Sequence, residues 1–342
     1  MPLVLRPWST NSYVMSKVWF RCGSVDLRVG DISAINSSVK SWLYADLLEK
    51  PSESVMCRPA SHGGLGVASV KYKAQAVLTK TFLETAAIPT FRHSLLHSLM
   101  FRYHVLGDSS VPDPGFLPYY PAAFFEVIKY AHLETPLNIL SMSISQWTRL
   151  LTEDGLTMET FGDTQRYIPC KSELSSPTSD WELSWRLCRL SGLGSDLASF
   201  NFKLLHGLLV TKQRMHQFSP GTSATCTLCE ENVDEDIQHA LLHCGYNDGA
   251  GQALLEAVHV QLPDTSAAAL LRLELAQLPE DLELPMVTFI STILLAIWEK
   301  RLSRSRILLY DIRATLEARC LLLRKTRLDN MVPNLVGLIN NL

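Results

Sequence analysis

The chain has 342 residues, 47% hydrophobic and 19% charged, a balance that excludes an intrinsically disordered protein and leaves room for two or three domains. Its net charge of −3 conceals an asymmetry: residues 1–108 sum to +5, residues 226–283 to −11 and residues 299–328 to +6. A surface for a polyanion is therefore expected near the two ends of the chain and not in its acidic middle.

Neither a secretory signal nor a membrane segment is expected. The first ten residues contain no long apolar core of the kind that a signal peptide carries. The apolar run at 286–298 has thirteen residues, fewer than the roughly 20 that cross a bilayer, so it predicts a buried helix. We expect an intracellular protein, nuclear or cytoplasmic, that is not secreted and has no membrane partner.

Apolar residues at helical spacing run through the first half of the chain. A glycine turn at 63–66 separates the first two predicted helices, and prolines make 107–121 a loop. The helices are expected at 32–48, 67–86, 93–106, 121–133 and 143–153. Proline and serine then cluster in the break at 155–180, which we take as the main domain boundary.

The second half continues the helical pattern, with few alternating β-branched residues and no internal repeat. Helices are expected from residue 181, at 196–218, 251–260 and 266–276, and as a long pair between 284 and 326. The predicted fold class is all-α, with several helical segments and a small Cys3His zinc-knuckle module. The predicted domains are a helical region at 1–155, a linker at 156–180, a helix pair with the zinc module at 181–250, and a C-terminal helical region with a basic helix at 251–342.

The residues that carry chemistry lie in one short stretch. Cys226-Thr-Leu-Cys229 is followed by nine residues, His239, four residues and Cys244. Three thiolates and one imidazole form the ligand set of a closed, tetrahedral structural zinc site, and the short gap favours a knuckle over a DNA-reading finger. His243 competes with Cys244 for the fourth position, and a chance or decayed cluster is a further alternative.

At these residues the chain resembles a known family. The chain is similar to the zinc-binding region of non-LTR (LINE-type) retrotransposon reverse transcriptases in the helix-and-turn sequence Asn201-Phe-Lys-Leu-Leu-His-Gly-Leu-Leu-Val-Thr-Lys-Gln-Arg-Met215, followed by Cys226-Thr-Leu-Cys229, His239 and Cys244. Val210 stands where that family often has proline. A weaker resemblance upstream, at 14–20, 35–44 and 63–66, is to the region after the polymerase palm. The resemblance implies a thumb-like, post-palm region at 1–155 and a bound zinc.

The catalytic parts of such a polymerase are not found in this sequence. The palm needs a Tyr/Phe-x-Asp-Asp turn that binds two metal ions, whereas Tyr44-Ala45-Asp46-Leu47 lacks the second carboxylate and ends an amphipathic helix. Pro263-Asp264 and Glu274-Leu-Ala lack the lysine of a Glu-x-Lys nuclease triad. We therefore expect no enzyme, no catalytic residues and no small-molecule substrate.

A basic helix near the C-terminus is the best candidate for contact with a phosphate backbone. The candidate residues are Lys300, Arg301, Arg304, Arg306, Arg313, Arg324, Lys325 and Arg327. They lead to the hypothesis of a non-catalytic accessory fragment of a LINE-type protein that binds RNA or an RNA–DNA duplex weakly through its backbone. The alternatives are an all-α interaction scaffold with structural zinc, whose basic face is solvated or docks on the acidic zinc segment, and a relic reading frame.

Overall fold

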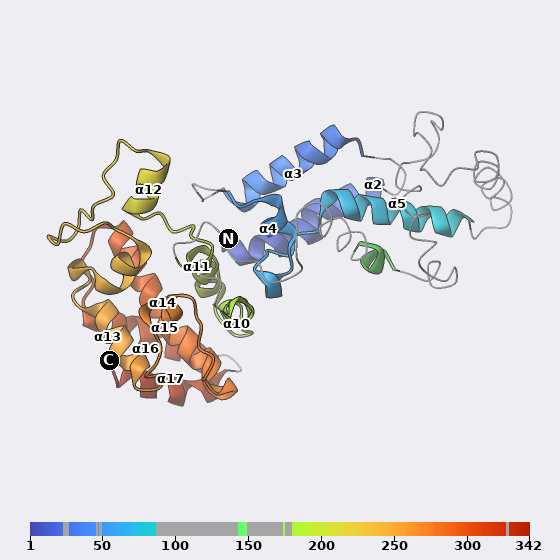
Figure 1. Ribbon diagram of the computed structural model, residues 1–342. Coiled ribbons are helices and arrows are strands. Elements are labelled where there is room, and N and C mark those ends of the chain that lie inside the picture. The colour runs from blue at the N-terminus through green and yellow to red at the C-terminus, as the bar shows by residue number, and fades with distance from the viewer. Residues whose placement is uncertain are drawn as a thin grey trace.

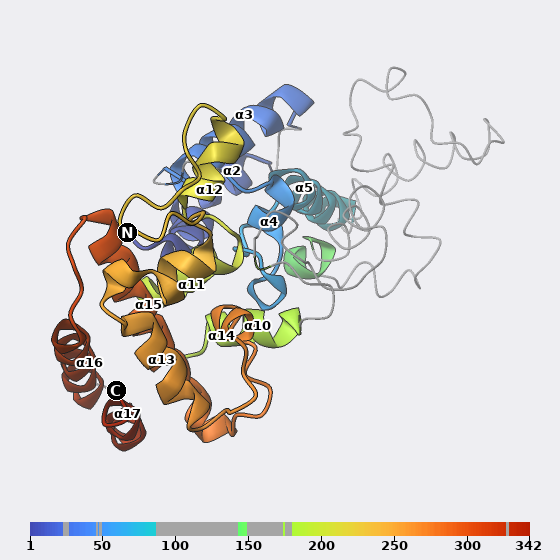
Figure 2. The same cartoon turned by 60° about the vertical axis from the view of Figure 1, so that its left-hand side comes forward.

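The computed structural model describes residues 1–22, 27–45, 47, 50–86, 143–148, 174, 180–325 and 328–342. Within these residues the regular structure is helical, and the β-type pairing is an isolated antiparallel bridge between Thr225 and Asp234. The all-α prediction is confirmed. Figures 1 and 2 show the N-terminal helices on one side of the molecule and the C-terminal helices gathered on the other, with α11 between them.

The described N-terminal region opens with four short elements in succession and continues with four more. The first four are η1 (Leu3–Leu5), α1 (Arg6–Ser9), η2 (Thr10–Val14) and α2 (Met15–Cys22). The later elements are α3 (Val29–Leu43), α4 (Glu53–Cys57), η3 (Ala60–His62) and α5 (Val70–Ala86). The predicted helices at 32–48 and 67–86 correspond to α3 and α5. The predicted helices at 93–106 and 121–133, the loop at 107–121 and most of the predicted linker at 156–180 lie outside the described residues.

The glycine turn at residues 63–66, after η3, packs against two helices that are distant in the chain, α10 (Trp181–Cys188) and α11 (Ser195–Leu205). Gly63 has φ +80°, and a Cβ on it would lie 2.6 Å from the Trp185 ring. His206 Nε2 lies 2.8 Å from the Gly63 carbonyl oxygen, and burial lowers the pKa of His206 to about 3. The neutral imidazole therefore donates a hydrogen bond to this turn, which fixes it against α10 and α11.

The predicted continuous helix at 196–218 is wrong, because α11 ends at Leu205 and α12 (Lys212–Phe218) begins separately. Gly207 adopts φ +64°, and the N–H of Leu208 donates to the Lys203 carbonyl over 2.8 Å. This is how a glycine-terminated helix satisfies its last carbonyls. Thr211 then begins α12 by accepting a hydrogen bond from the Arg214 N–H over 3.1 Å.

The C-terminal half is built around α15 (Glu280–Leu302), which packs against α11, α13, α16 and α17. The other elements are η5 (His239–His243), η6 (Gly245–Asn247), α13 (Ala250–His259), α14 (Ala267–Leu271), α16 (Leu309–Arg324), η7 (Asp329–Met331) and α17 (Val332–Ile339). The expected long pair between 284 and 326 is α15 with α16. α14 is shorter than the predicted 266–276, because Leu273 turns to φ +56°.

Helix α15 is long and apolar enough to cross a membrane by length and composition alone, but 72% of its most apolar window is buried inside the protein. Burial of Phe289, Ile290 and Ile293 places it in the main hydrophobic core. Its acidic first turn is tied to α10, where the Arg186 guanidinium donates two hydrogen bonds of 2.6 Å to the Glu283 carboxylate. These contacts are those of a core helix.

Candidate metal centre

The two cysteines of the Cys-x-x-Cys pair lie in a turn closed by backbone pairing. The N–H of Cys226 donates to the Val233 carbonyl over 2.8 Å, and the N–H of Glu235 donates to the Ala224 carbonyl over 2.9 Å. The intervening loop doubles back on itself, with Asn232 in the left-handed region at φ +53°. Asparagine tolerates this conformation better than most residues. The loop therefore presents both thiols on one side.

The other two residues of the motif lie at the two ends of η5, a single π-helical turn that begins at His239 and is directly followed by Cys244. The Asp236 carboxylate accepts the N–H of His239 over 2.6 Å, and the N–H of Cys244 donates to the His239 carbonyl over 2.8 Å. This wider turn brings positions five apart close to the same side, whereas an α-helix would separate them by about 140° around its axis. The π-turn thus explains how His239 and Cys244 converge.

Tight packing against α13 holds this turn in place. Ala240, Leu241 and Leu242 are buried in the main core. A Cβ on Gly251 of α13 would lie 2.4 Å from the Leu242 Cα, so only glycine permits this approach. The side chain of Asn247 also donates to the Ala240 carbonyl over 3.0 Å.

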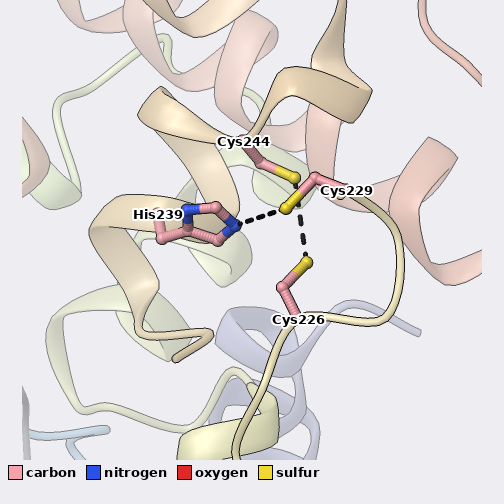
Figure 3. Close-up of side chains that lie close together, drawn as sticks. All are labelled: Cys226, Cys229, His239 and Cys244. Atoms are coloured by element: carbon pink, nitrogen blue, oxygen red, sulfur yellow. Dashed lines mark hydrogen bonds between the residues drawn. The ribbon is translucent and has the colours of Figure 1, made fainter. Parts of the chain in front are cut away.

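The four candidate ligands meet in one cluster, as Figure 3 shows. Their ligand atoms all lie within 4.8 Å of one another. Cys226 Sγ is 3.9 Å from Cys244 Sγ, and Cys229 Sγ is 3.4 Å from His239 Nε2. Around a tetrahedral zinc the corresponding separations are about 3.8 Å for two sulfurs and about 3.5 Å for sulfur and nitrogen. The donor set and its dimensions fit a zinc ion with no open coordination position.

The competing ligand lies elsewhere. His243 is exposed and is not part of the cluster, while Cys244 is buried within it. On the other side, Glu231 Oε2 lies 3.8 Å from Nδ1 of His239, the ring nitrogen that does not face the sulfurs. A carboxylate near the second nitrogen of a metal-binding histidine orients the ring. Sequence reasoning did not identify Glu231 in this position.

The thiols differ in their readiness to ionise. Burial raises the pKa of Cys226, but hydrogen bonds from the backbone N–H groups of Leu228 and Cys229 and from Arg301 outweigh it and lower that pKa to about 7. Burial raises the pKa of Cys229 to about 11. Zinc binds thiolates and supplies the charge that stabilises them, so binding must displace the Cys229 proton near neutral pH.

Zinc affinity should therefore fall as the pH is lowered. Because the zinc-bound site holds fewer protons than the metal-free site, acid favours release, and zinc binding at pH 8 should liberate at least the proton of Cys229. Titration of metal-free protein with zinc in weak buffer, followed by a pH indicator, measures this release. Uptake of zinc at pH 8 without release of protons would contradict the thiolate assignment.

A buried arginine from α15 contacts the Cys3His cluster. Arg301 is 6% exposed, and its Nη2 lies 3.3 Å from Cys226 Sγ and 2.5 Å from Glu235 Oε2. Burial by itself lowers the pKa of Arg301, but hydrogen bonds to Cys244, Glu235 and Cys226 raise it above its usual value. Glu235 also accepts the N–H of Lys212 over 3.2 Å, at the start of α12. One buried ion pair thus joins the metal centre, α12 and α15.

This placement separates Arg301 from the other basic residues expected to meet phosphate. Arg301 points inward and pairs with Glu235 of the acidic zinc segment, which agrees, for this residue, with the alternative that the basic face docks on that segment. Lys300 is half-buried and 3.6 Å from Asp311. Arg327 lies outside the described residues. The remaining candidates are exposed on α16 or next to it: Arg304, Arg306, Arg313, Arg324 and Lys325.

Comparison with known families agrees with this geometry. Residues 169–249 match the family model described as zinc-binding in reverse transcriptase. No curated protein matches the chain. The matched residues contain all four members of the Cys3His cluster. The chain therefore contains a zinc-binding, reverse-transcriptase-associated domain.

Proposed function

We propose that the chain is a non-catalytic, nucleic-acid-binding accessory region of a LINE-type retrotransposon protein, in which zinc is structural. The observation that carries the proposal is the closed Cys3His cluster inside a segment that matches a reverse-transcriptase-associated family. A zinc held by four protein ligands has no position for a substrate or a reactive water. Its role is then to hold α12 and η5 against α15.

Charge supports a backbone-driven contact with RNA or an RNA–DNA duplex. Arg304 and Arg306 lie exposed in the connection from α15 to α16, and Arg313 follows on the first turns of α16. Exposed guanidinium groups displace the counterions of a polyphosphate, which gives weak, salt-dependent and sequence-independent binding. The acidic zinc segment repels phosphate and therefore has an architectural role.

We expect reversal of Arg304, Arg306 and Arg313 to glutamate to weaken binding to duplex RNA and to flatten its salt dependence. Each lost phosphate contact should reduce the log–log slope by roughly 0.7 to 0.9. The matched control reverses charge on the exposed zinc loop, Glu230 and Asp234 to lysine, and should leave binding intact or strengthen it. Glu235 is unsuitable for this control because it is buried against Arg301. If the salt dependence of RNA binding is the same in the triple variant as in the wild type, these three arginines do not contact the phosphates.

A second candidate, a protein-interaction scaffold, is favoured by one observation. Helix α16 exposes Tyr310, Leu321 and Leu322, the first by 77% and the others by 57% each. Apolar side chains on the helix that also carries the arginines could contact another protein. No binding of the wild type to RNA even at low salt would favour the scaffold.

We further expect no template-dependent nucleotide incorporation on primed RNA, with either magnesium or manganese. Helix α3 ends at Leu43, and Tyr44 at its C-terminus is fully buried, so Tyr44 is a core residue. Asp46 lies outside the described residues. Replacing Asp46 with alanine should leave any background signal unchanged, and incorporation that vanished in this variant would overturn the non-catalytic proposal.

A further inference from the structure

The helical segment from Arg6 to Cys22, formed by α1, η2 and α2, has an inner and an outer face of different character. Its inner side chains are buried, among them Pro7, Thr10 and Met15. Its outer face carries three aromatic rings, of which Trp8 is 63%, Tyr13 65% and Phe20 88% exposed. Large rings that are this exposed cost solvation free energy and commonly mark an interaction site.

The π-helical turn η2 aligns the rings. Trp8 and Tyr13 are five residues apart, a spacing that a regular α-helix would place about 140° apart around its axis. Across the wider turn their ring centroids lie 5.7 Å apart in an edge-to-face arrangement at 79°. Phe20, in α2, follows Tyr13 of η2 by seven residues, a spacing that returns to nearly the same side of a helix. The three rings thus form one row along the helix.

Positive charge accompanies this row. Residues 1–22 contain Arg6, Lys17 and Arg21 and no aspartate or glutamate. Lys17 is exposed four residues after Tyr13 and three before Phe20, so it lies between their rings on the helix surface. Arg21 is exposed in the next turn. We call Trp8, Tyr13, Lys17, Phe20 and Arg21 the N-terminal stripe.

We propose that the N-terminal stripe binds single-stranded nucleic acid, with its rings stacked on unpaired bases and its cations beside the phosphates. The proposal rests on the proposed function in taking a polynucleotide as the partner, and it adds a second contact of a different kind. Rings on a helical segment that carries basic residues and no acidic residue of its own are complementary to a chain of flat bases joined by anions. A duplex offers no free base faces along its length, so the stripe should prefer unpaired strands.

The composition of the stripe favours single-stranded nucleic acid over a lipid surface as its partner. A helix that lies on a membrane has a continuous apolar face of leucine and aromatic residues. Here the hydroxyls of Ser12 and Ser16 are exposed beside the rings, while Leu3 and Met15 are buried in the core. Rings that are interrupted by hydroxyls and by Lys17 do not form the continuous apolar face of a helix that lies on a membrane.

The test uses the zinc-loaded full chain and four labelled probes of twelve nucleotides. These are oligothymidylate DNA, oligouridylate RNA, an abasic DNA strand and a duplex RNA. We expect both base-bearing single strands to bind more tightly than the abasic strand, which has the same charge. In the double variant Tyr13→Ser and Phe20→Ser, the affinity for both base-bearing single strands should fall by roughly 25-fold or more. The loss of each ring should lower the affinity by roughly 5-fold or more. The conservative variant Tyr13→Trp should retain binding.

Phe218→Ser is the matched control, because it removes a ring that is 53% exposed on α12, away from both the stripe and the arginines of α16, and should leave single-strand binding unchanged. The truncated side chains are exposed, so a thermal unfolding curve should show the double variant folded. Equal affinity for abasic and base-bearing strands, or an unaffected double variant, overturns the stripe. The proposal is also overturned if the rings are needed for binding to phosphatidylserine vesicles, or for self-association, and the single strands do not bind.

The two proposals can fail separately. Suppose that duplex binding depends on Arg304, Arg306 and Arg313 but the protein shows no preference for base-bearing strands. This result contradicts the role proposed for the stripe and leaves the proposed function in place. Ring-dependent binding of single strands without any binding of the duplex supports the stripe and removes the basic surface near α16. No binding of any probe at low salt removes both.

Discussion

Replacing Cys229 with serine should remove the zinc and unfold the segment from about residue 223 to 246. Structural zinc can contribute on the order of 10 kcal/mol of folding free energy near neutral pH, and a hydroxyl is a poor substitute for a thiolate ligand. The damage should extend into α13, since Gly251 packs directly against Leu242 in the π-turn. Elemental analysis should find well under one zinc per chain, and hydrogen exchange should show lost protection from the knuckle through α13.

A cysteine outside the cluster provides the control. Cys320 is buried in α16 and is not part of the Cys3His cluster. Its replacement by serine alters a buried thiol in the same way but should retain one zinc per chain and normal protection of the knuckle. Retention of a full zinc equivalent by the Cys229 variant would show that the ligand set is wrong.

Replacing Arg301 with methionine should destabilise the zinc-loaded protein by about 3–5 kcal/mol, the usual cost of leaving one member of a buried ion pair without its partner. Glu235 would remain buried without its cation, and three thiolates on one zinc leave a net negative charge that Arg301 now offsets at 3.3 Å. Urea unfolding measures the loss of stability. Transfer of zinc to a chelator should also become faster.

A double variant separates the ion pair from general damage to α15. Adding Glu235→Gln to Arg301→Met removes the orphaned charge and should recover part of the stability, which gives a measurable coupling energy. Arg304→Met is the control, because Arg304 is exposed just beyond the end of α15 and its loss should change stability by less than about 0.5 kcal/mol. Additive single effects would show that Arg301 and Glu235 do not act together.

The sequence was sufficient to predict the features that depend on local spacing. Apolar residues at helical intervals predict α13 and α15, and the Cys-x-x-Cys pair with a nearby histidine predicts the donor set. The break between α11 and α12 was missed although its signal is present. Gly207 and Thr211 stand where a helix stop and a helix start are expected, but the apolar pattern continues across them and suggests one helix.

Features that depend on distant contacts could not be predicted in this way. The choice between His243 and Cys244 depends on a π-turn, and that turn depends on how Leu241 and Leu242 enter the core. The inward orientation of Arg301 depends on where α15 ends relative to Glu235, a pairing between residues far apart in the chain. The sequence pattern places Arg301 in a basic run and carries no sign that this one side chain turns inward.

The ion pair between Glu235 and Arg301 has a consequence for synthesis on the ribosome. The last zinc ligand, Cys244, leaves the exit tunnel well before Arg301, because the chain is made from its N-terminus. During that interval the knuckle can collect its four ligands but lacks the cation that covers Cys226 and neutralises Glu235. For the same reason a fragment cut at residue 249, where the family match ends, carries every ligand and yet leaves this side of the centre open to solvent and chelators.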